Sequence, residues 1–201
     1  MASFTTKTFQ KHDSYMTPRY AWENIKQFVP KDKILWESFV GDGESGRIWT
    51  SMGYNVIQNP YPEYDFFKYE PDNYDIIVTN PPFSKTKQVM ERMAELDKPF
   101  IMIMPSSKIN TQYFRKFAAK LDPHQLQIIV PRTRIQFKKL VNGKPQANFK
   151  DRCNFNCFYY AYKMNLPNDM IWLDDNALKK NKPEWNEQAL MAAEDININS
   201  L

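Results

Sequence analysis

The sequence predicts an α/β protein with a mostly parallel sheet that is covered by helices on both faces. Short apolar runs alternate with helix-like stretches along most of the 201 residues, which is typical of βαβ units. Hydrophobic residues make up 42% of the chain and aromatic residues 15%, enough for one packed domain. Glycine is scarce, with 5 residues where average usage gives about 14, and four of the five lie between Gly41 and Gly53.

Six strands and three helices are expected, and they alternate along most of the chain. Each expected strand is a short apolar run, and several are rich in β-branched residues. The expected strands are Lys33–Phe39, Tyr54–Ile57, Asp75–Thr79, Phe100–Met104, Leu126–Val130 and Phe155–Tyr162. The expected helices are Glu44–Met52, Lys85–Leu96 and Thr111–Leu121.

The segment between the last two strands, residues 131–152, is expected to be a basic hairpin or loop. It contains Asn142-Gly143, a strong turn signal, so the flanking strands are expected to pair antiparallel. Its six basic residues and no acidic one up to Lys150 indicate contact with a polyanion, although an ordinary solvated loop has the same pattern. Residues 1–164 are expected to form the domain, and residues 165–201, with seven acidic and three basic residues, an acidic tail.

The composition also bears on the cellular location of the protein and on membrane spans and metal sites. No apolar run approaches the roughly 20 residues of a membrane span, and the N-terminus has no secretory h-region. We therefore expect no membrane partner and an intracellular location, cytoplasmic or nuclear. Two cysteines and two histidines, scattered along the chain, predict no metal site.

The glycine cluster has the spacing G-x-G-x-x-G, formed by Gly41, Gly43 and Gly46, directly after a strand and at the start of a helix. Such a loop lets a nucleotide-like ligand approach the backbone at the carboxyl end of the strand. Asp42 and Glu44 would repel a pyrophosphate, so a cationic ligand such as S-adenosylmethionine fits better. A dinucleotide and a tight turn without a ligand are the alternatives.

A second motif, Asn80-Pro81-Pro82-Phe83, follows the strand Asp75–Thr79. Two consecutive prolines fix the backbone and remove two N–H donors, and they keep Asn80 out of the helical region. The motif is therefore a rigid projection at the carboxyl end of a strand, with an amide side chain beside an aromatic ring.

Together these motifs resemble the S-adenosylmethionine-dependent methyltransferases that act on adenine N6, whose signature Asp/Asn-Pro-Pro-Tyr/Phe is matched at all four positions. The resemblance runs from about Tyr15 to Tyr162 and implies a Rossmann-like class I fold, with seven strands and the last one antiparallel. It implies that S-adenosylmethionine is the methyl donor and that residues 80–83 are catalytic. Taken together with the glycine loop, the residues expected to bind the donor are Tyr15, Thr17, Glu37, Phe39, Gly41, Gly43, Gln58, Asp65 and Phe66.

One position departs from the family. An acidic residue that usually binds the ribose is missing at the end of the second strand, where the sequence reads Gln58-Asn59. Gln58 or Asn59 could bond the ribose without charge assistance, and Glu63 could substitute if its loop folds back. A catalytically silent, methyltransferase-like subunit that binds nucleic acid is therefore an alternative to an enzyme.

The resemblance implies methyl transfer to adenine in nucleic acid, with DNA slightly favoured over RNA. The Asn80 side-chain oxygen and the Pro81 carbonyl would accept from the adenine amino group, and Phe83 would stack on the base. The basic segment is short, so a partner subunit or a homodimer is possible. The residues expected to contact nucleic acid are Lys85, Arg132, Arg134, Lys138, Lys139 and Lys144.

Overall fold

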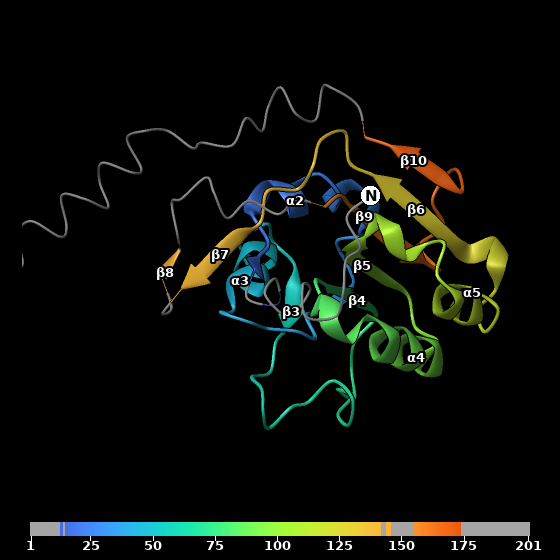
Figure 1. Ribbon diagram of the computed structural model, residues 1–201. Coiled ribbons are helices and arrows are strands. Elements are labelled where there is room, and N and C mark those ends of the chain that lie inside the picture. Colours follow the sequence, from blue (N-terminus) through green and yellow to red (C-terminus); the bar gives the residue numbers. More distant parts are fainter. Residues whose placement is uncertain (1–12, 14, 142–143, 146–154, 174–201) are drawn as a thin grey trace, which may run out of the picture.

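The computed structural model describes residue 13, residues 15–141, 144–145 and 155–173 (Figure 1). Seven strands form one sheet in the order β10-β6-β9-β5-β4-β2-β3. β9 runs antiparallel to its neighbours β5 and β6, and the other neighbouring pairs are parallel. This confirms the predicted α/β, Rossmann-like fold. The strands are β2 Ile34–Trp36, β3 Asn55–Ile57, β4 Ile76–Thr79, β5 Phe100–Pro105, β6 Leu126–Val130, β9 Cys157–Tyr162 and β10 Met170–Trp172.

Six of these strands were expected, and β10 was not. β10 pairs in parallel with β6 and carries the sheet to Trp172, past the boundary expected at residue 164. The run Met170–Leu173 is short and follows a polar stretch, so its pairing depends on β6 rather than on a local pattern. Residues 174–201, the rest of the expected acidic tail, lie outside the described residues.

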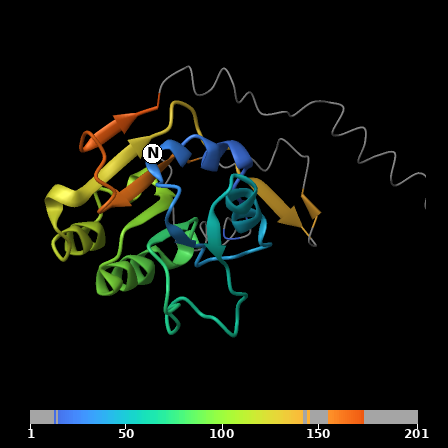
Figure 2. The same cartoon turned by 180° about the vertical axis from the view of Figure 1, so that it is seen from behind.

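Helices cover both faces of the sheet (Figures 1 and 2). α4 and α5 lie on one face, and α2 and α3 lie on the other. The three expected helices are present, with slightly different ends, and α2 and four short 3-10 helices are additional. The α-helices are α2 Arg19–Glu23, α3 Glu44–Ser51, α4 Thr86–Leu96 and α5 Gln112–Ala118. The 3-10 helices are Lys26–Phe28, Phe83–Lys85, Ser106–Lys108 and Pro123–Gln125.

The sheet is apolar on both faces, as a doubly covered sheet must be. Alternate residues of β5 divide between the two layers: Phe100, Met102 and Met104 pack under α4 and α5, and Ile101 and Ile103 pack under α2 and α3. All five side chains are completely buried. The side chains of this central strand therefore contribute to both halves of the core.

A second, small sheet projects from the body (Figure 1). It consists of β1 Tyr15–Met16, β7 Lys138–Val141 and β8 Lys144–Pro145, in the order β1-β7-β8. β7 and β8 pair antiparallel on either side of residues 142–143, as expected for a hairpin with an Asn-Gly turn. We call β7 and β8 the basic hairpin. In the described part of the chain, no helix is both long enough and apolar enough to cross a membrane.

Candidate ligand-binding site

A cavity of about 240 Å³ opens at the carboxyl ends of β2 and β4, the edge of the sheet where ligands of open α/β folds bind. Four segments form its wall: the N-terminal segment with β1, the loop after β2 with the start of α3, the loop after β3, and the loop after β4. The lining residues are Asp13, Tyr15, Met16, Thr17, Ser38, Phe39, Val40, Gly41, Ser45, Asn59, Tyr61, Tyr64, Asp65, Phe66, Phe67, Asn80, Pro82 and Lys85.

Many of the predicted site residues meet in this wall. They are Tyr15, Thr17, Phe39, Gly41, Asp65, Phe66, Asn80, Pro82 and Lys85. Glu37, Gly43, Gln58, Pro81 and Phe83 lie in the same loops but do not line the cavity. Exposed Arg132 and Arg134 follow β6 instead, and Lys138, Lys139 and Lys144 lie on β7 and β8, where only the backbone is described.

The glycine loop turns sharply between β2 and α3. Gly41 and Gly43 have φ angles of +56° and +78°, a region that favours glycine. A Cβ atom on Gly41 would lie 3.2 Å from the sulfur of Met16, so β1 packs directly on this loop. The loop and β1 therefore form one continuous wall of the cavity.

Gln58, the expected ribose ligand, packs against the start of α3. A Cβ atom on Gly46 would lie only 2.1 Å from Gln58 Oε1, so the absence of a side chain at Gly46 makes room for the amide. Gln58 Oε1 is buried and accepts no hydrogen bond from the described residues. Asn59 lines the cavity, whereas Glu63 is exposed and does not. Of the three alternatives, Asn59 is thus the one in the wall.

Gly46→Ala is expected to push the Gln58 amide aside while keeping the helix, since alanine is the better helix former by about 1 kcal/mol. If Gln58 helps to hold an adenosyl ligand, calorimetry with S-adenosylhomocysteine should show an affinity about three- to tenfold lower, the loss of roughly one hydrogen bond. The double variant Gly46→Ala/Gln58→Ala is the control, because it has no amide to displace. Equal affinities of Gly46→Ala and the wild type would contradict a role for the Gln58 position.

Glu37 lies at the end of β2, behind the wall formed by Ser38 and Phe39, and is only 1% exposed. Its Oε1 accepts a hydrogen bond from the Phe39 N–H (3.0 Å) and one from the Thr79 hydroxyl. Burial raises the pKa of Glu37 to about 8, although these two hydrogen bonds lower it. The carboxyl group is therefore mainly protonated at pH 7, and a nearby cation would favour its ionisation.

Buried polar atoms without a partner gather at this edge of the sheet. Buried polar groups are normally paired, and each unpaired group costs about 1–3 kcal/mol. Five such side-chain atoms belong to the segments predicted to bind a ligand. Three of them, on Thr17, Ser38 and Asn80, belong to residues that line the cavity, where a polar ligand would satisfy them. Within the described residues the five atoms are Thr17 Oγ1, Glu37 Oε2, Ser38 Oγ, Gln58 Oε1 and Asn80 Oδ1; a sixth, Trp49 Nε1, lies on α3.

The Asn-Pro-Pro-Phe motif is divided between the cavity and the core. Asn80 and Pro82 line the cavity, whereas Phe83 is 3% exposed and packs among other aromatic rings. Asp13, which the sequence patterns did not single out, accepts hydrogen bonds from the Ser84 N–H (3.2 Å) and from the Ser84 hydroxyl. The N-terminal segment is thus tied to the turn that follows the motif.

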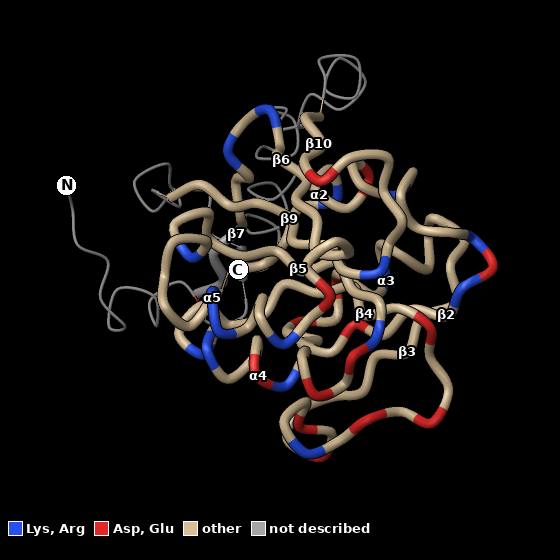
Figure 3. The backbone as a smooth tube through the Cα atoms, turned by 90° about the vertical axis from the view of Figure 1, so that its right-hand side faces the viewer, with Lys and Arg blue, Asp and Glu red and all other residues tan. Residues whose placement is uncertain are grey.

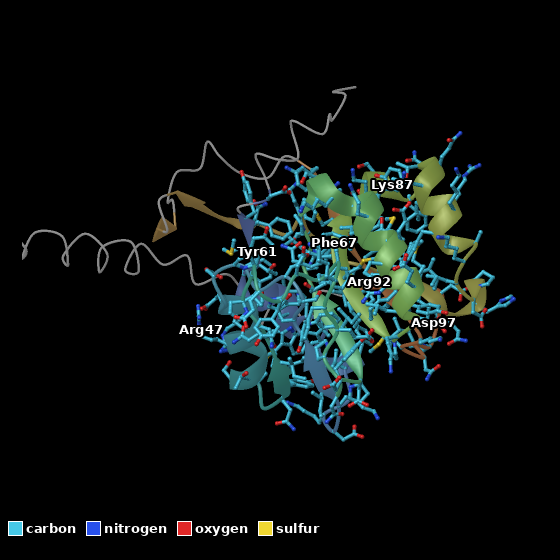
Figure 4. The ribbon with its side chains drawn as sticks, turned by 90° about the horizontal axis from the view of Figure 1, so that it is seen from below. Arg47, Tyr61, Phe67, Lys87, Arg92 and Asp97 are labelled. Carbon is cyan, nitrogen blue, oxygen red and sulfur yellow. The ribbon has the colours of Figure 1, made fainter. Side chains whose placement is uncertain are left out.

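Aromatic rings form the opposite end of the cavity. The Phe66 ring packs 4.8 Å from that of Phe39 and 5.5 Å from that of Trp36, measured between ring centroids. Asp65 accepts a hydrogen bond from the Phe67 N–H (3.1 Å), which fixes the turn. In Figure 4, Tyr61 and Phe67 lie between α3, which carries Arg47, and α4. Aromatic side chains in a cavity wall can pack against a purine ring by stacking or by edge contacts.

The lining residues that the sequence patterns did not single out are Asp13, Met16, Ser38, Val40, Ser45, Tyr61, Tyr64 and Phe67. The aromatic density between Tyr61 and Tyr69 was a usable signal, since this stretch is rich in rings yet follows no strand or helix pattern. No comparable signal marks Asp13, because its partner Ser84 is 71 positions away.

Acidic and basic residues are unevenly distributed along the chain. The loop after β3, residues 59–75, has five acidic residues and one lysine, and Figure 3 shows the acidic positions along it. From Lys98 to Lys150 the chain has eleven lysines and arginines and a single acidic residue, Asp122.

Comparison with known proteins adds no family assignment. No protein-family model matches the chain, and a search of curated proteins finds no matching relative. The functional interpretation therefore depends on the cavity and on the motifs that line it.

Proposed function

We propose that this protein transfers a methyl group from S-adenosylmethionine to the N6 amino group of adenine in nucleic acid. The observation that carries the proposal is the composition of the cavity wall. Asn80 and Pro82 of the Asn-Pro-Pro-Phe motif share one cavity with the glycine loop and with the Asp65-Phe66 segment. In this proposal, the cavity would hold the methyl donor and would place an acceptor for an exocyclic amino group beside it.

The chemistry of the wall fits S-adenosylmethionine, which would supply an activated methyl group on a cationic sulfur. Thr17 and the glycine loop would hold its methionine part, and Glu37 would stabilise its positive charge from behind the wall. Phe39, Asp65 and Phe66 would hold its adenine. The unpaired buried hydroxyl groups of Thr17 and Ser38, which line the cavity, support this assignment, because each can donate a hydrogen bond to a polar ligand or accept one from it.

Asn80 would act on the target base. Its Oδ1 is buried without a partner among the described residues and can accept one hydrogen of the adenine amino group. The Pro81 carbonyl is the second proposed acceptor. Held in this way, the amino nitrogen would be positioned to attack the methyl carbon without prior loss of a proton. The bond between that carbon and sulfur would break, S-adenosylhomocysteine would leave, and the methylated nitrogen would then release a proton to solvent. Catalysis would be mainly orientation and stabilisation of shifting charge.

Nucleic acid would lie across the basic side of the molecule. Lys85 follows β4 and lines the cavity, Arg132 and Arg134 follow β6, and the hairpin carries three further lysines. Such residues bind phosphates, which give affinity without sequence specificity. A target adenine in a duplex would have to leave the base stack to reach the cavity. DNA is the first substrate to test and RNA the second.

The decisive experiment is transfer of a labelled methyl group from S-adenosylmethionine to adenine-containing DNA and RNA, followed by digestion to nucleosides. The expected product is N6-methylated deoxyadenosine, or N6-methylated adenosine if RNA is the substrate. Absence of transfer to both nucleic acids would contradict the proposal.

The position of Gln58 favours one alternative, a silent subunit that binds nucleic acid. Gln58 is neutral where the resembling enzymes have an acid, and it does not line the cavity. Micromolar binding of S-adenosylmethionine in calorimetry would remove the basis of this alternative.

A further inference from the structure

The basic hairpin is attached to the Asn-Pro-Pro-Phe motif by an aromatic contact at its base. Phe137 directly precedes β7, and its ring packs edge to face on Phe83 at 6.0 Å and 76°. Phe155, on the far side of the hairpin segment, packs on the same Phe83 ring at 5.5 Å and 75°. Both ends of this 17-residue connection, residues 138–154, therefore hold the last residue of the motif.

Further contacts make the base of the hairpin rigid. Ile135 is 1% exposed, and the Gln136 N–H donates a hydrogen bond to the Tyr20 hydroxyl on α2 (2.7 Å). The Arg134 side chain donates to Asn156 Oδ1 (3.1 Å) and so joins the two ends of the connection. The base of the hairpin is thus anchored to the body, and a displacement of the hairpin would change the packing around Phe83.

The same hairpin is joined to the ligand cavity through β1. β7 pairs antiparallel with β1, where Lys139 faces Tyr15 and Lys138 faces Met16. Tyr15 and Met16 line the cavity, and Met16 packs on the glycine loop. β1 is therefore a strand of the basic hairpin sheet and a wall of the cavity at once.

We propose that these contacts couple two binding events: a nucleic acid on the basic hairpin and an adenosyl ligand in the cavity each strengthen the binding of the other. The identities of the two ligands rest on the proposed function. Phe137 is a positioning residue in this scheme, since it acts through Phe83 and β7 and touches neither ligand. Coupling between two sites is reciprocal and typically changes an affinity about 5- to 150-fold.

Calorimetry with S-adenosylhomocysteine, with and without a saturating single-stranded DNA oligonucleotide, tests the proposal without any need for turnover. In the wild-type protein the oligonucleotide is expected to tighten S-adenosylhomocysteine binding about tenfold. We call the affinity for S-adenosylhomocysteine with the oligonucleotide, divided by the affinity without it, the coupling ratio. Phe137→Leu, which keeps an apolar side chain but loses the ring, should bring the coupling ratio close to one. Tyr20→Phe, a milder change that removes only the hydroxyl group, should lower the ratio in the same direction.

Phe117→Leu is the matched control. Phe117 is buried like Phe137, with 3% of its surface exposed against 7%, and packs on two rings, Phe100 and Phe114, but it lies on the opposite face of the sheet. Phe117→Leu should lower the stability of the protein about as much as Phe137→Leu does, but it should keep the coupling ratio of the wild type. A coupling ratio of one in the wild-type protein would overturn the proposal. So would a loss of coupling in Phe117→Leu as large as that in Phe137→Leu.

The two proposals fail in different ways. Coupled binding without methyl transfer would refute the proposed enzyme and leave the coupling intact. Methyl transfer with independent binding of the two ligands would refute the coupling and leave the enzyme intact.

Discussion

Asn80→Ala is expected to lower kcat for methyl transfer by about 100- to 1,000-fold, the usual effect of losing one preorganised hydrogen-bonding group. Asn80 Oδ1 is buried at the cavity wall with no partner among the described residues, so its proposed role is to accept from the substrate. The affinity for S-adenosylmethionine should stay within about threefold, because the proposed donor contacts come from other segments. Steady-state kinetics and calorimetry measure the two quantities separately.

Two variants sharpen this test. Asn80→Asp keeps an acceptor oxygen at the same place and should retain much more activity than Asn80→Ala. Asn73→Ala removes the amide of an exposed asparagine on the loop after β3 and should leave kcat unchanged. Unchanged kcat in Asn80→Ala would refute the assigned role.

Glu37→Gln is expected to make the protein more stable by about 3 kcal/mol at pH 7 and to weaken binding of S-adenosylmethionine. Burial raises the pKa of Glu37 from 4.5 to about 8. Between these values the folded protein binds more protons at this site than the unfolded chain, so the free energy of unfolding falls as pH rises. From pH 4.5 to 7 the loss is roughly 3 kcal/mol at 1.36 kcal/mol per pH unit. Glutamine does not titrate and avoids this loss, and its side-chain oxygen can still accept from Thr79 and Phe39.

The same carboxyl group makes binding of the cationic donor depend on pH. A positive charge prefers the ionised form, so wild-type affinity should increase as pH rises from 6 towards about 8, with uptake of a proton by the buffer. In Glu37→Gln this pH dependence should disappear, and affinity above pH 8 should be about tenfold lower than in the wild type.

Denaturant unfolding at pH 5 and pH 7, together with calorimetry in two buffers of different ionisation enthalpy, measures both effects. Glu91→Gln is the control, since it changes an exposed glutamate on α4. A Glu37→Gln variant with wild-type stability at both pH values and wild-type donor affinity would show that the buried carboxyl group has neither role.

Local patterns in the sequence predicted most of the fold. Short apolar runs located six of the seven strands, because side chains buried on both faces of a sheet must be apolar at nearly every position. The glycine loop and the Asn-Pro-Pro motif were placed correctly after β2 and β4, since glycine and proline act on the backbone within one or two residues. The strand β10 was not predicted, because three residues next to a polar stretch have no periodic pattern.

The site was predictable only in part. Phe39, Gly41, Asp65 and Asn80 line the cavity, because the loops that follow neighbouring parallel strands meet at one edge of the sheet. Thr17 follows β1 of the small sheet, so its place in the wall depends on tertiary packing.

The sequence by itself determined the order of the elements, the edge of the sheet where the cavity lies and the charge of its surroundings. Only the tertiary structure decided that Gln58 packs over Gly46, that Phe83 faces Phe137 and Phe155, and that β1 pairs with β7. The physical reason is the difference in the sequence separation over which these interactions act. Backbone preferences and apolar periodicity act over a few residues, whereas these contacts join segments up to about 120 residues apart, and packing against distant neighbours selects them.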